Sequence, residues 1–423
     1  MEQKDRFFSY FMIFTLIVGV IFGKFFISEY PIVPGFNFIY KFLVVLLFLY
    51  TLYIKRHSIN KLYFKLLVFI FVYFGFMLIY SFLIGSNDPK AILLDFNLLI
   101  TPFIIFCTTV ILVPDVRKSK SLKLTIAFGI LCNLIEVFVR IANGSMWVLE
   151  EGAFINSNGL YTHTTGLSNS IFILALLYLY IHKESKKHII YFLLILCTGL
   201  FAARSKFFGI CALSVFLLLF FQRIRLQLSV KNIVTGIILL LFIVIIGYSK
   251  INTYFVEGAE EGNLQSRLFL YLGAAEIFRT YVPFGSGIAS FASPYTIKEY
   301  YSPIYYSLGM DKIRGLTPDN PIHVGDAFFP ILAEFGIIGV FLFFYFFYFI
   351  VKKTNIYQDR TKREINIEYL LITIILGYIF INSIAEGTFL ARTGHLAMIV
   401  LGLCMTDLKR KGEALEIKNL ECK

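Results

Sequence analysis

Long apolar runs, separated by short charged segments, recur from one end of the chain to the other. A run of about 18 or more apolar residues can cross a bilayer core about 30 Å thick as an α-helix. The pattern predicts about twelve such helices, so we expect an all-α polytopic membrane protein with one integral membrane domain, residues 1–423. The expected spans lie near 7–23, 37–54, 63–84, 92–113, 124–142, 168–182, 189–203, 207–221, 232–248, 327–350, 368–385 and 389–406.

The positive charges follow the same alternation. Of the 39 Lys and Arg residues, 26 lie in the N-terminal segment, in alternate loops and in the C-terminal segment. Loops rich in Lys and Arg stay in the cytoplasm, so both termini are expected to be cytoplasmic, in a bacterial inner membrane. The net charge of +12 is thereby explained by topology, and no nucleic-acid partner is expected.

Two of the loops expected on the outer face are long, residues 143–167 and residues 250–325. Long loops in a compact protein are usually functional. Within the second, residues 264–281 place apolar side chains at helical spacing between charged ones, which predicts an amphipathic helix lying at the membrane interface.

Three residues near the outer face could bind an anion or accept a proton. Arg204 lies where two apolar runs meet, and Arg267 begins the amphipathic helix. Each guanidinium suits a pyrophosphate, although a headgroup-facing Arg is the alternative interpretation of both. His323 precedes the tenth run and could accept a proton near neutral pH, or be structurally unremarkable.

Other polar residues are weaker candidates. Asp326 could orient His323, while Asn320 and Glu334 could support the site. Lys206 is expected to extend toward the lipid headgroups. The sequence has neither a paired CxxC nor an HExxH motif, so neither a metal nor another cofactor is expected.

Several of these residues form an ordered pattern. It consists of Ala203–Arg204–Ser205 at a helix junction, Ser266–Arg267 before Pro283–Phe284–Gly285–Ser286–Gly287, and His323 before Ala333–Glu334–Phe335–Gly336. Over residues 195–350 the chain resembles the O-antigen polymerase and O-antigen ligase superfamily. It departs from that family in having Val324 after His323, where Asn is frequent.

The resemblance implies a membrane glycosyltransferase with a GT-C-like fold and an active site on the outer face. Arg204 and Arg267 would hold the pyrophosphate of an undecaprenyl-linked glycan, and His323 would activate the acceptor. We expect an O-antigen or capsular polysaccharide polymerase of the Wzy type. Its partners would be a lipid-linked donor, a lipid-linked acceptor, membrane lipid and a chain-length regulator protein.

Two alternatives remain. The first is an O-antigen ligase, which would share the fold and donor but transfer the glycan to lipid A core. The second is a lipid-linked oligosaccharide flippase or other transporter. Transporters often contain internal repeats and charged residues at midplane, whereas here the polar residues gather in one outer loop.

The charge distribution predicts the topology directly. Cysteines introduced at Lys118 or Arg223 should react with an impermeant maleimide only from the cytoplasmic side. Cysteines at Ser157 or Glu261 should react from outside. Labelling of position 223 from outside would overturn the assignment.

Overall fold

The computed structural model describes residues 2–27, 36–57, 59–142, 159–161, 164–183, 187–202, 204–220, 234, 266–296, 300–321, 323–360 and 366–421. Within these ranges the regular structure is helical, apart from an isolated bridge between Thr317 and Asn320. The α-helices are α1 (Gln3–Leu16), α2 (Gly23–Ile27), α3 (Phe36–Lys55), α4 (Lys61–Ile84), α5 (Pro89–Leu112), α6 (Lys120–Ala142), α7 (Thr164–Ile181), α8 (Lys187–Thr198), α9 (Ser205–Phe220), α12 (Ser266–Thr280), α13 (Pro303–Ser307), α14 (Gly336–Arg360), α15 (Ile367–Ser383) and α16 (Arg392–Glu421). Shorter turns of other helix types are η1 (Ile17–Ile21), η2 (Val116–Lys118), η3 (Gly199–Ala202), η6 (Met310–Lys312), η7 (Phe329–Phe335) and η8 (Thr388–Leu390).

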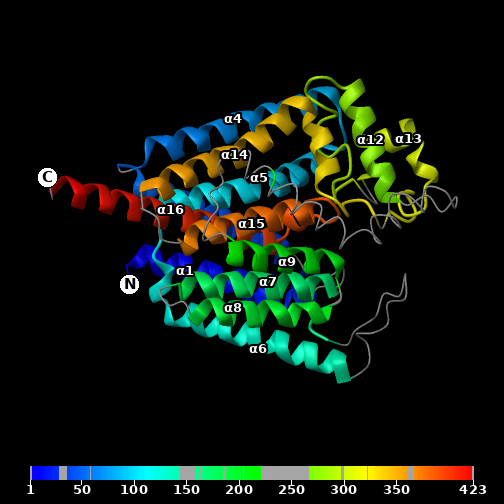
Figure 1. The fold of residues 1–423 in the computed structure, drawn as a ribbon. Coiled ribbons are helices and arrows are strands. Elements are labelled where there is room, and N and C mark those ends of the chain that lie inside the picture. The colour runs from blue at the N-terminus through cyan, green and yellow to red at the C-terminus, as the bar shows by residue number, and fades with distance from the viewer. Residues whose placement is uncertain are drawn as a thin grey trace.

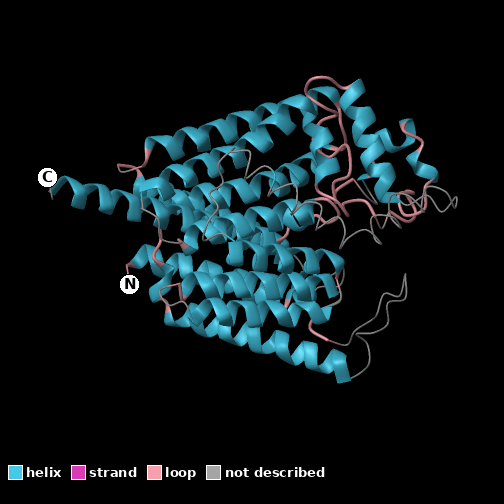
Figure 2. Ribbon diagram, in the orientation of Figure 1, coloured by secondary structure: helices cyan, strands magenta, loops and turns pink. Residues whose placement is uncertain are grey.

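The long helices lie roughly side by side, and the two ends of the bundle differ (Figure 1). Both chain termini lie at one end, which we call the termini end. Helices α12 and α13 and much of the irregular backbone lie at the other, which we call the loop end (Figure 2). The two termini therefore share one end, as the alternation of charge predicts.

The helix lengths and surfaces support a polytopic membrane protein. Among the residues that the structure describes, six helices are long and apolar enough to span a bilayer, namely α3 to α7 and the segment Phe329–Gln358. Large apolar side chains such as Phe38, Leu83 and Phe341 point outward, and a water-facing surface rarely carries apolar patches of this extent. The count of about twelve spans stays a prediction, and the expected span 232–248 lies outside the described residues, except for Val234.

Helices α5, α7, α15 and α16 form the centre of the bundle. Helix α16 packs against α5, α7, α14 and α15. The middle of α16, from Leu396 to Met405, is buried. These inner helices carry apolar side chains around most of their circumference, as helices buried on all sides do.

The amphipathic helix expected over 264–281 is present as α12. Leu270, Ala274 and Ile277 are buried on one face, at positions i, i+4 and i+7, and Phe278 is half-buried. This face packs against η7. At the same end, the Tyr271 hydroxyl donates to the carbonyl of Ile384 at 2.6 Å, which fixes α12 next to the turn between α15 and α16.

Two buried carboxyl groups hold the irregular segment that follows α12. Asp95 Oδ2 accepts from the amide of Ala289 at 3.0 Å, and Ser293 Oγ donates to Asp95 Oδ1 at 2.5 Å. Glu334 Oε1 accepts from the amide of Phe291 at 2.8 Å. Backbone amides inside an apolar bundle need such partners, because no water replaces them.

A network of buried charges joins three helices at the termini end. Lys183 Nζ, just after α7, lies 2.5 Å from Glu368 Oε1 on α15 and 2.7 Å from Asp407 Oδ2 on α16. Lys411 Nζ lies 2.8 Å from the same Glu368 oxygen, and Tyr180 donates to Asp407 at 2.9 Å. Opposite charges thus compensate one another where water is excluded.

Replacing Glu368 by Gln should destabilise the bundle, because Lys183 would lose one of its two carboxylate partners. Breaking a buried pair costs about 3–5 kcal/mol, and we expect a loss of about 3 kcal/mol because Asp407 remains. Thermal unfolding in detergent measures it. The control Glu2→Gln breaks a 2.8 Å pair with Lys4 in which the Glu2 side chain is exposed, and it should leave the melting temperature unchanged. Equal melting temperatures for both variants would contradict a stabilising network.

Candidate functional site

The candidate site lies at the loop end and is built around one carboxylate oxygen. Arg267 Nη2 donates to Asp326 Oδ2 at 3.1 Å, and His323 Nδ1 lies 2.9 Å from the same oxygen. The side chains of Arg267, Asp326 and His323 are 23%, 30% and 40% exposed, respectively. The cluster is therefore open on one side, where a substrate can reach it.

The shared carboxylate also sets the state of the imidazole. A carboxylate only accepts hydrogen bonds, so Nδ1 of His323 must be the donor. The neutral ring then presents Nε2 as an acceptor. An imidazole in this form can take a proton from a hydroxyl group placed next to Nε2.

The charge on Asp326 is stabilised by its neighbours. Burial alone would raise the pKa of its carboxyl group, but the hydrogen bond from His323 and the positive charge of Arg267 outweigh burial. The pKa of Asp326 is therefore lower than the usual value for an aspartate. Asp326 remains an anion at neutral pH, which its role as an acceptor for two donors requires.

The backbone around His323 leaves room for its ring. The amide of His323 donates to the carbonyl of Gly315 at 2.9 Å. Gly315 has φ +84°, and a Cβ atom there would lie 2.3 Å from His323 Cδ2. Only glycine satisfies both the left-handed backbone and the close approach of the imidazole.

A second ion pair lies beside the first cluster. Lys206 Nζ on α9 donates to Glu386 Oε1 at 2.7 Å and to the carbonyl of Ala385 at 2.9 Å. The other oxygen of Glu386 accepts from Thr388 at 2.7 Å and from Asn169 on α7 at 3.2 Å. Helices α7 and α9 and the turn η8 therefore meet at one carboxylate at the loop end.

The two clusters are adjacent. The amide of Phe328 donates to the carbonyl of Ser383 at 3.0 Å, and a Cβ atom on Gly387 would lie 3.0 Å from the carbonyl oxygen of Gly325. The charges of Arg267 and Asp326 also act on Lys206. Cationic groups from α9 and α12 thus share one region, with Asp326 and Glu386 between them.

The structure brings together two of the three predicted residues, Arg267 and His323, through the predicted Asp326. Arg204 lies at the beginning of α9, half-buried, and its Nε donates to Thr164 Oγ1 at the beginning of α7. Arg204 precedes Lys206 by two residues at the loop end, and its convergence with Arg267, Asp326 and His323 stays a prediction.

Lys206 requires a correction. The sequence predicts a lysine that extends toward the headgroups, whereas the structure pairs it with Glu386 inside the cluster. Reasoning from the sequence also leaves Asn169 and Thr388 unassigned. The partners lie some 180 residues apart along the chain, so helical spacing alone gives no signal for their contact.

The two other supporting residues lie apart from the cluster. Asn320 is exposed, and its amide donates to Thr317 in a short turn. Glu334 is fully buried and holds the amide of Phe291. Their predicted supporting roles stay predictions, although the contact of Glu334 shows that it fixes the backbone of a neighbouring segment.

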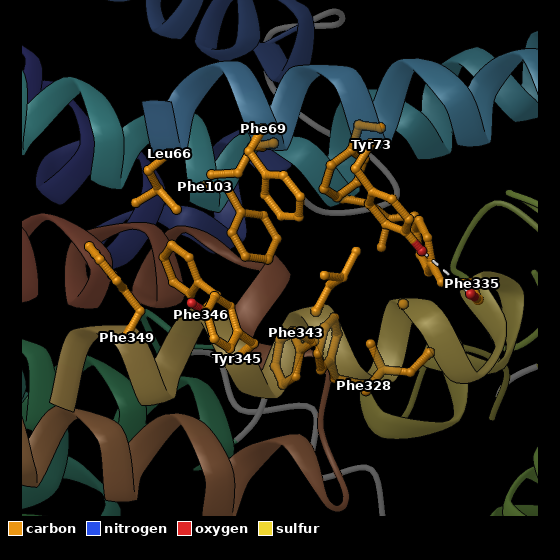
Figure 3. A pocket seen from close by; sticks show the side chains of 16 residues that line it. Leu66, Phe69, Tyr73, Phe103, Phe328, Phe335, Phe343, Tyr345, Phe346 and Phe349 are labelled. Carbon is orange, nitrogen blue, oxygen red and sulfur yellow. Dashed lines mark hydrogen bonds between the residues drawn. The ribbon is translucent and has the colours of Figure 1, made fainter. Parts of the chain in front are cut away.

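An apolar pocket lies elsewhere in the bundle. It occupies about 90 Å³ between α4, α5 and α14 and is lined almost entirely by Phe, Leu and Ile side chains. Figure 3 shows Phe103 and Phe343 facing it, and the hydroxyl of Tyr73 turned to the carbonyl of Phe335 at 3.4 Å. It contains no titratable carboxyl, imidazole or cationic group, so it cannot carry acid–base chemistry.

No group of three or more His, Cys, Asp or Glu side chains suited to a metal ion was found in the described part of the chain. The charged groups of the candidate site are instead two cation–carboxylate clusters open on one side. Such an arrangement can bind an anion through its cations and move a proton through His323.

One family model matches the part of the chain that contains these residues. Residues 189–344 match the family model described as O-antigen ligase. The match includes Arg204, Arg267 and His323, and it confirms the resemblance to the O-antigen ligase and polymerase superfamily. No curated protein and no solved structure matches the chain.

The pair Lys206–Glu386 should show energetic coupling. We expect Lys206→Gln and Glu386→Gln to be less destabilising together than the sum of their separate effects, with a coupling energy of about 1–2 kcal/mol. Thermal unfolding of the four proteins of the cycle measures it. The more exposed pair Lys409–Glu413, 3.5 Å apart, is the control and should couple by less than about 1 kcal/mol. Additive effects at Lys206 and Glu386 would show that their contact contributes nothing.

Proposed function

We propose that this chain is a polysaccharide polymerase that transfers a glycan from undecaprenyl pyrophosphate to a lipid-linked repeat unit. The family match supports an O-antigen ligase or polymerase type of function. The observation that carries the proposal is the shared oxygen of Asp326, which joins a pyrophosphate-binding candidate, Arg267, to a base, His323.

In this mechanism, the acceptor hydroxyl lies against Nε2 of His323. The hydroxyl oxygen attacks the anomeric carbon of the donor while its proton passes to His323. The bond between that carbon and the pyrophosphate oxygen breaks, and the electron pair leaves with the lipid pyrophosphate. The proton on His323 then passes to the departing pyrophosphate or to solvent, which restores the base.

Arg267 and Arg204 would act on the leaving group. Negative charge grows on the pyrophosphate as the bond breaks, and donors fixed in a poorly hydrated place stabilise such charge most. Arginine suits this task because its planar donors can hold two oxygens at once. Lys206 adds a further cation beside them, held by Glu386.

The ligase is the principal alternative, and the family match covers both kinds of enzyme without deciding between them. Both enzymes would use the same donor and differ in the acceptor. The acceptor therefore decides between them. Purified protein given donor with either a lipid-linked repeat unit or lipid A core should extend the repeat unit if it is a polymerase. Transfer to lipid A core alone would instead identify a ligase.

Replacing Arg204, Arg267 or His323 by Ala should abolish or nearly abolish polymer in detergent solution. Removing a general base costs about 10²–10⁴-fold in rate, and Lys at either Arg position should restore little because it lacks the planar fork. Length analysis of the product glycans measures the effect.

The matched control is Arg279→Ala, which removes an exposed arginine from the same helix as Arg267. It should retain polymer. Lys206 cannot serve as a second control, because its pair with Glu386 lies inside the region. If His323→Ala retained the full rate, acid–base catalysis by this residue would be excluded. Activity that required a sealed membrane would point instead to transport.

A further inference from the structure

A second group of cations lies at the loop end, apart from the cluster around Asp326. Lys41 is on the second turn of α3, and Arg392 is the first residue of α16. Both side chains are half-buried. His395 and Arg392 both contact Tyr40, at 2.8 Å from its hydroxyl and 5.0 Å from its ring centre, respectively. Lys41 follows Tyr40 in α3, so the three groups are close neighbours.

Neither cation has a carboxylate in an ion pair within the described ranges. Lys41 Nζ contacts the hydroxyl of Tyr295 at 3.3 Å and lies 5.4 Å from the centre of that ring. Arg392 donates to the side-chain oxygen of Asn37 and lies 5.0 Å from the centre of the Tyr40 ring. Hydroxyl, amide and ring faces position the two cations without neutralising them.

The nearest acidic influence on Lys41 is Asp95. Its carboxyl group is already bound by the amide of Ala289 at 3.0 Å and by the hydroxyl of Ser293 at 2.5 Å. These neutral donors leave the negative charge of Asp95 in place, so it offsets part of the charge of Lys41, but the repulsion from Arg392 acts on Lys41 more strongly. Incompletely compensated charges of one sign held together at low polarity are costly unless an anion joins them.

His395 provides an independent sign of a binding place. It is 3% exposed, and its Nδ1 is bonded to the Tyr40 hydroxyl at 2.8 Å, with the two rings stacked at 5.6 Å. Its Nε2 is buried and has no partner among the described residues. Because a buried polar atom without a partner costs about 1–3 kcal/mol, it is rarely kept without a function.

The space for Arg392 is provided by Gly19 in η1. A Cβ atom on Gly19 would lie 2.7 Å from Cγ and 2.9 Å from Cβ of Arg392. The stem of Arg392 therefore crosses the backbone at the one position where no side chain blocks it. Gly19→Ala would displace the guanidinium while keeping its charge.

We propose that Lys41 and Arg392 bind the pyrophosphate of the second lipid-linked substrate, the acceptor. This inference rests on the proposed function, which requires two such substrates. Arg267 and Arg204 would hold the donor, whose pyrophosphate leaves during transfer, while Lys41 and Arg392 would hold the acceptor, whose pyrophosphate stays. The first amides of α16 add to the attraction, because a helix N-terminus favours anions.

The two anion sites lie on either side of one short turn. Glu386, which holds Lys206, precedes η8, and Arg392 follows it. Helix α5, which carries Asp95, also contacts η8. Two lipid headgroups bound at these places would therefore have their glycans directed into the same end of the bundle.

The test counts the bound ligand on the full chain in phosphatidylcholine nanodiscs, with undecaprenyl pyrophosphate as the probe. We expect about two saturable equivalents per chain, one for each cation cluster. The double variant Lys41→Gln/Arg392→Gln should bind one equivalent only. This should be the same equivalent that is lost in Arg267→Gln. The inference is overturned if the double variant still binds two equivalents with unchanged affinity. It is also overturned if the wild type binds only one equivalent and Arg267→Gln abolishes it.

The matched control is Lys90→Gln. Lys90 lies near the loop end and 5.8 Å from the centre of the Tyr300 ring, much as Lys41 lies over Tyr295. It should retain both equivalents. Gly19→Ala should weaken the equivalent assigned to Lys41 and Arg392 and leave the other unchanged; equal weakening of both would contradict two separate sites.

Stability separates a binding role from a structural one. Without ligand, Lys41→Gln removes a repulsion, so its melting temperature should equal or exceed that of the wild type. The rise in melting temperature on adding undecaprenyl pyrophosphate should shrink. A lower melting temperature without ligand and an undiminished rise with it would make Lys41 structural and contradict the proposal.

Two further measurements identify the ligand and separate this inference from the proposed function. If phosphatidylglycerol in the nanodiscs displaces the second equivalent, the place is a phospholipid headgroup site and the acceptor assignment is wrong. In the transfer assay, Lys41→Gln should raise KM for the lipid-linked acceptor and leave KM for the donor unchanged. A wild-type chain that binds two equivalents but transfers no glycan refutes the proposed function and the name acceptor, but leaves the second pyrophosphate site in place.

Discussion

The hydrogen bonds from backbone amides to Asp95 and Glu334 are the constraint on which the loop end depends. The segment after α12 is irregular, yet it lies against apolar helices where unpaired amides would be costly. Asp95 holds Ala289, and Glu334 holds Phe291. With this segment fixed between α5 and η7, α12 and the residues before α14 have defined positions, so Arg267 can reach Asp326.

Carboxylates neutralise the buried and half-buried Lys and Arg side chains more completely at the termini end of the bundle than at the loop end. At the termini end, Lys183 is enclosed by Glu368 and Asp407 and has no capacity for a ligand. At the loop end, Arg267 and Lys206 each have a carboxylate but remain partly exposed. Lys41 and Arg392 have none among the described residues. The less completely the protein neutralises a cation, the more strongly that cation can attract a substrate anion.

The sequence contains much of this arrangement but not all of it. Apolar runs and helical spacing predict the long helices and α12, because these signals are local. The proximity of Asp326 to His323 is also local, since the two lie three residues apart. The pairing of Lys206 with Glu386 and the approach of Arg392 to Gly19 depend on how distant helices pack, which no periodicity encodes.

If Arg267 binds the substrate's phosphate as proposed, the single oxygen of Asp326 that serves both Arg267 and His323 would make anion binding and proton binding cooperative. A phosphate that draws Arg267 toward itself leaves more of the carboxylate's charge to the imidazole, and the phosphate adds negative charge of its own. By reciprocity, a proton on the imidazole strengthens the hold on the phosphate. Departure of the anion then promotes departure of the proton, so the release of one product would return the protein to its starting state for the next cycle.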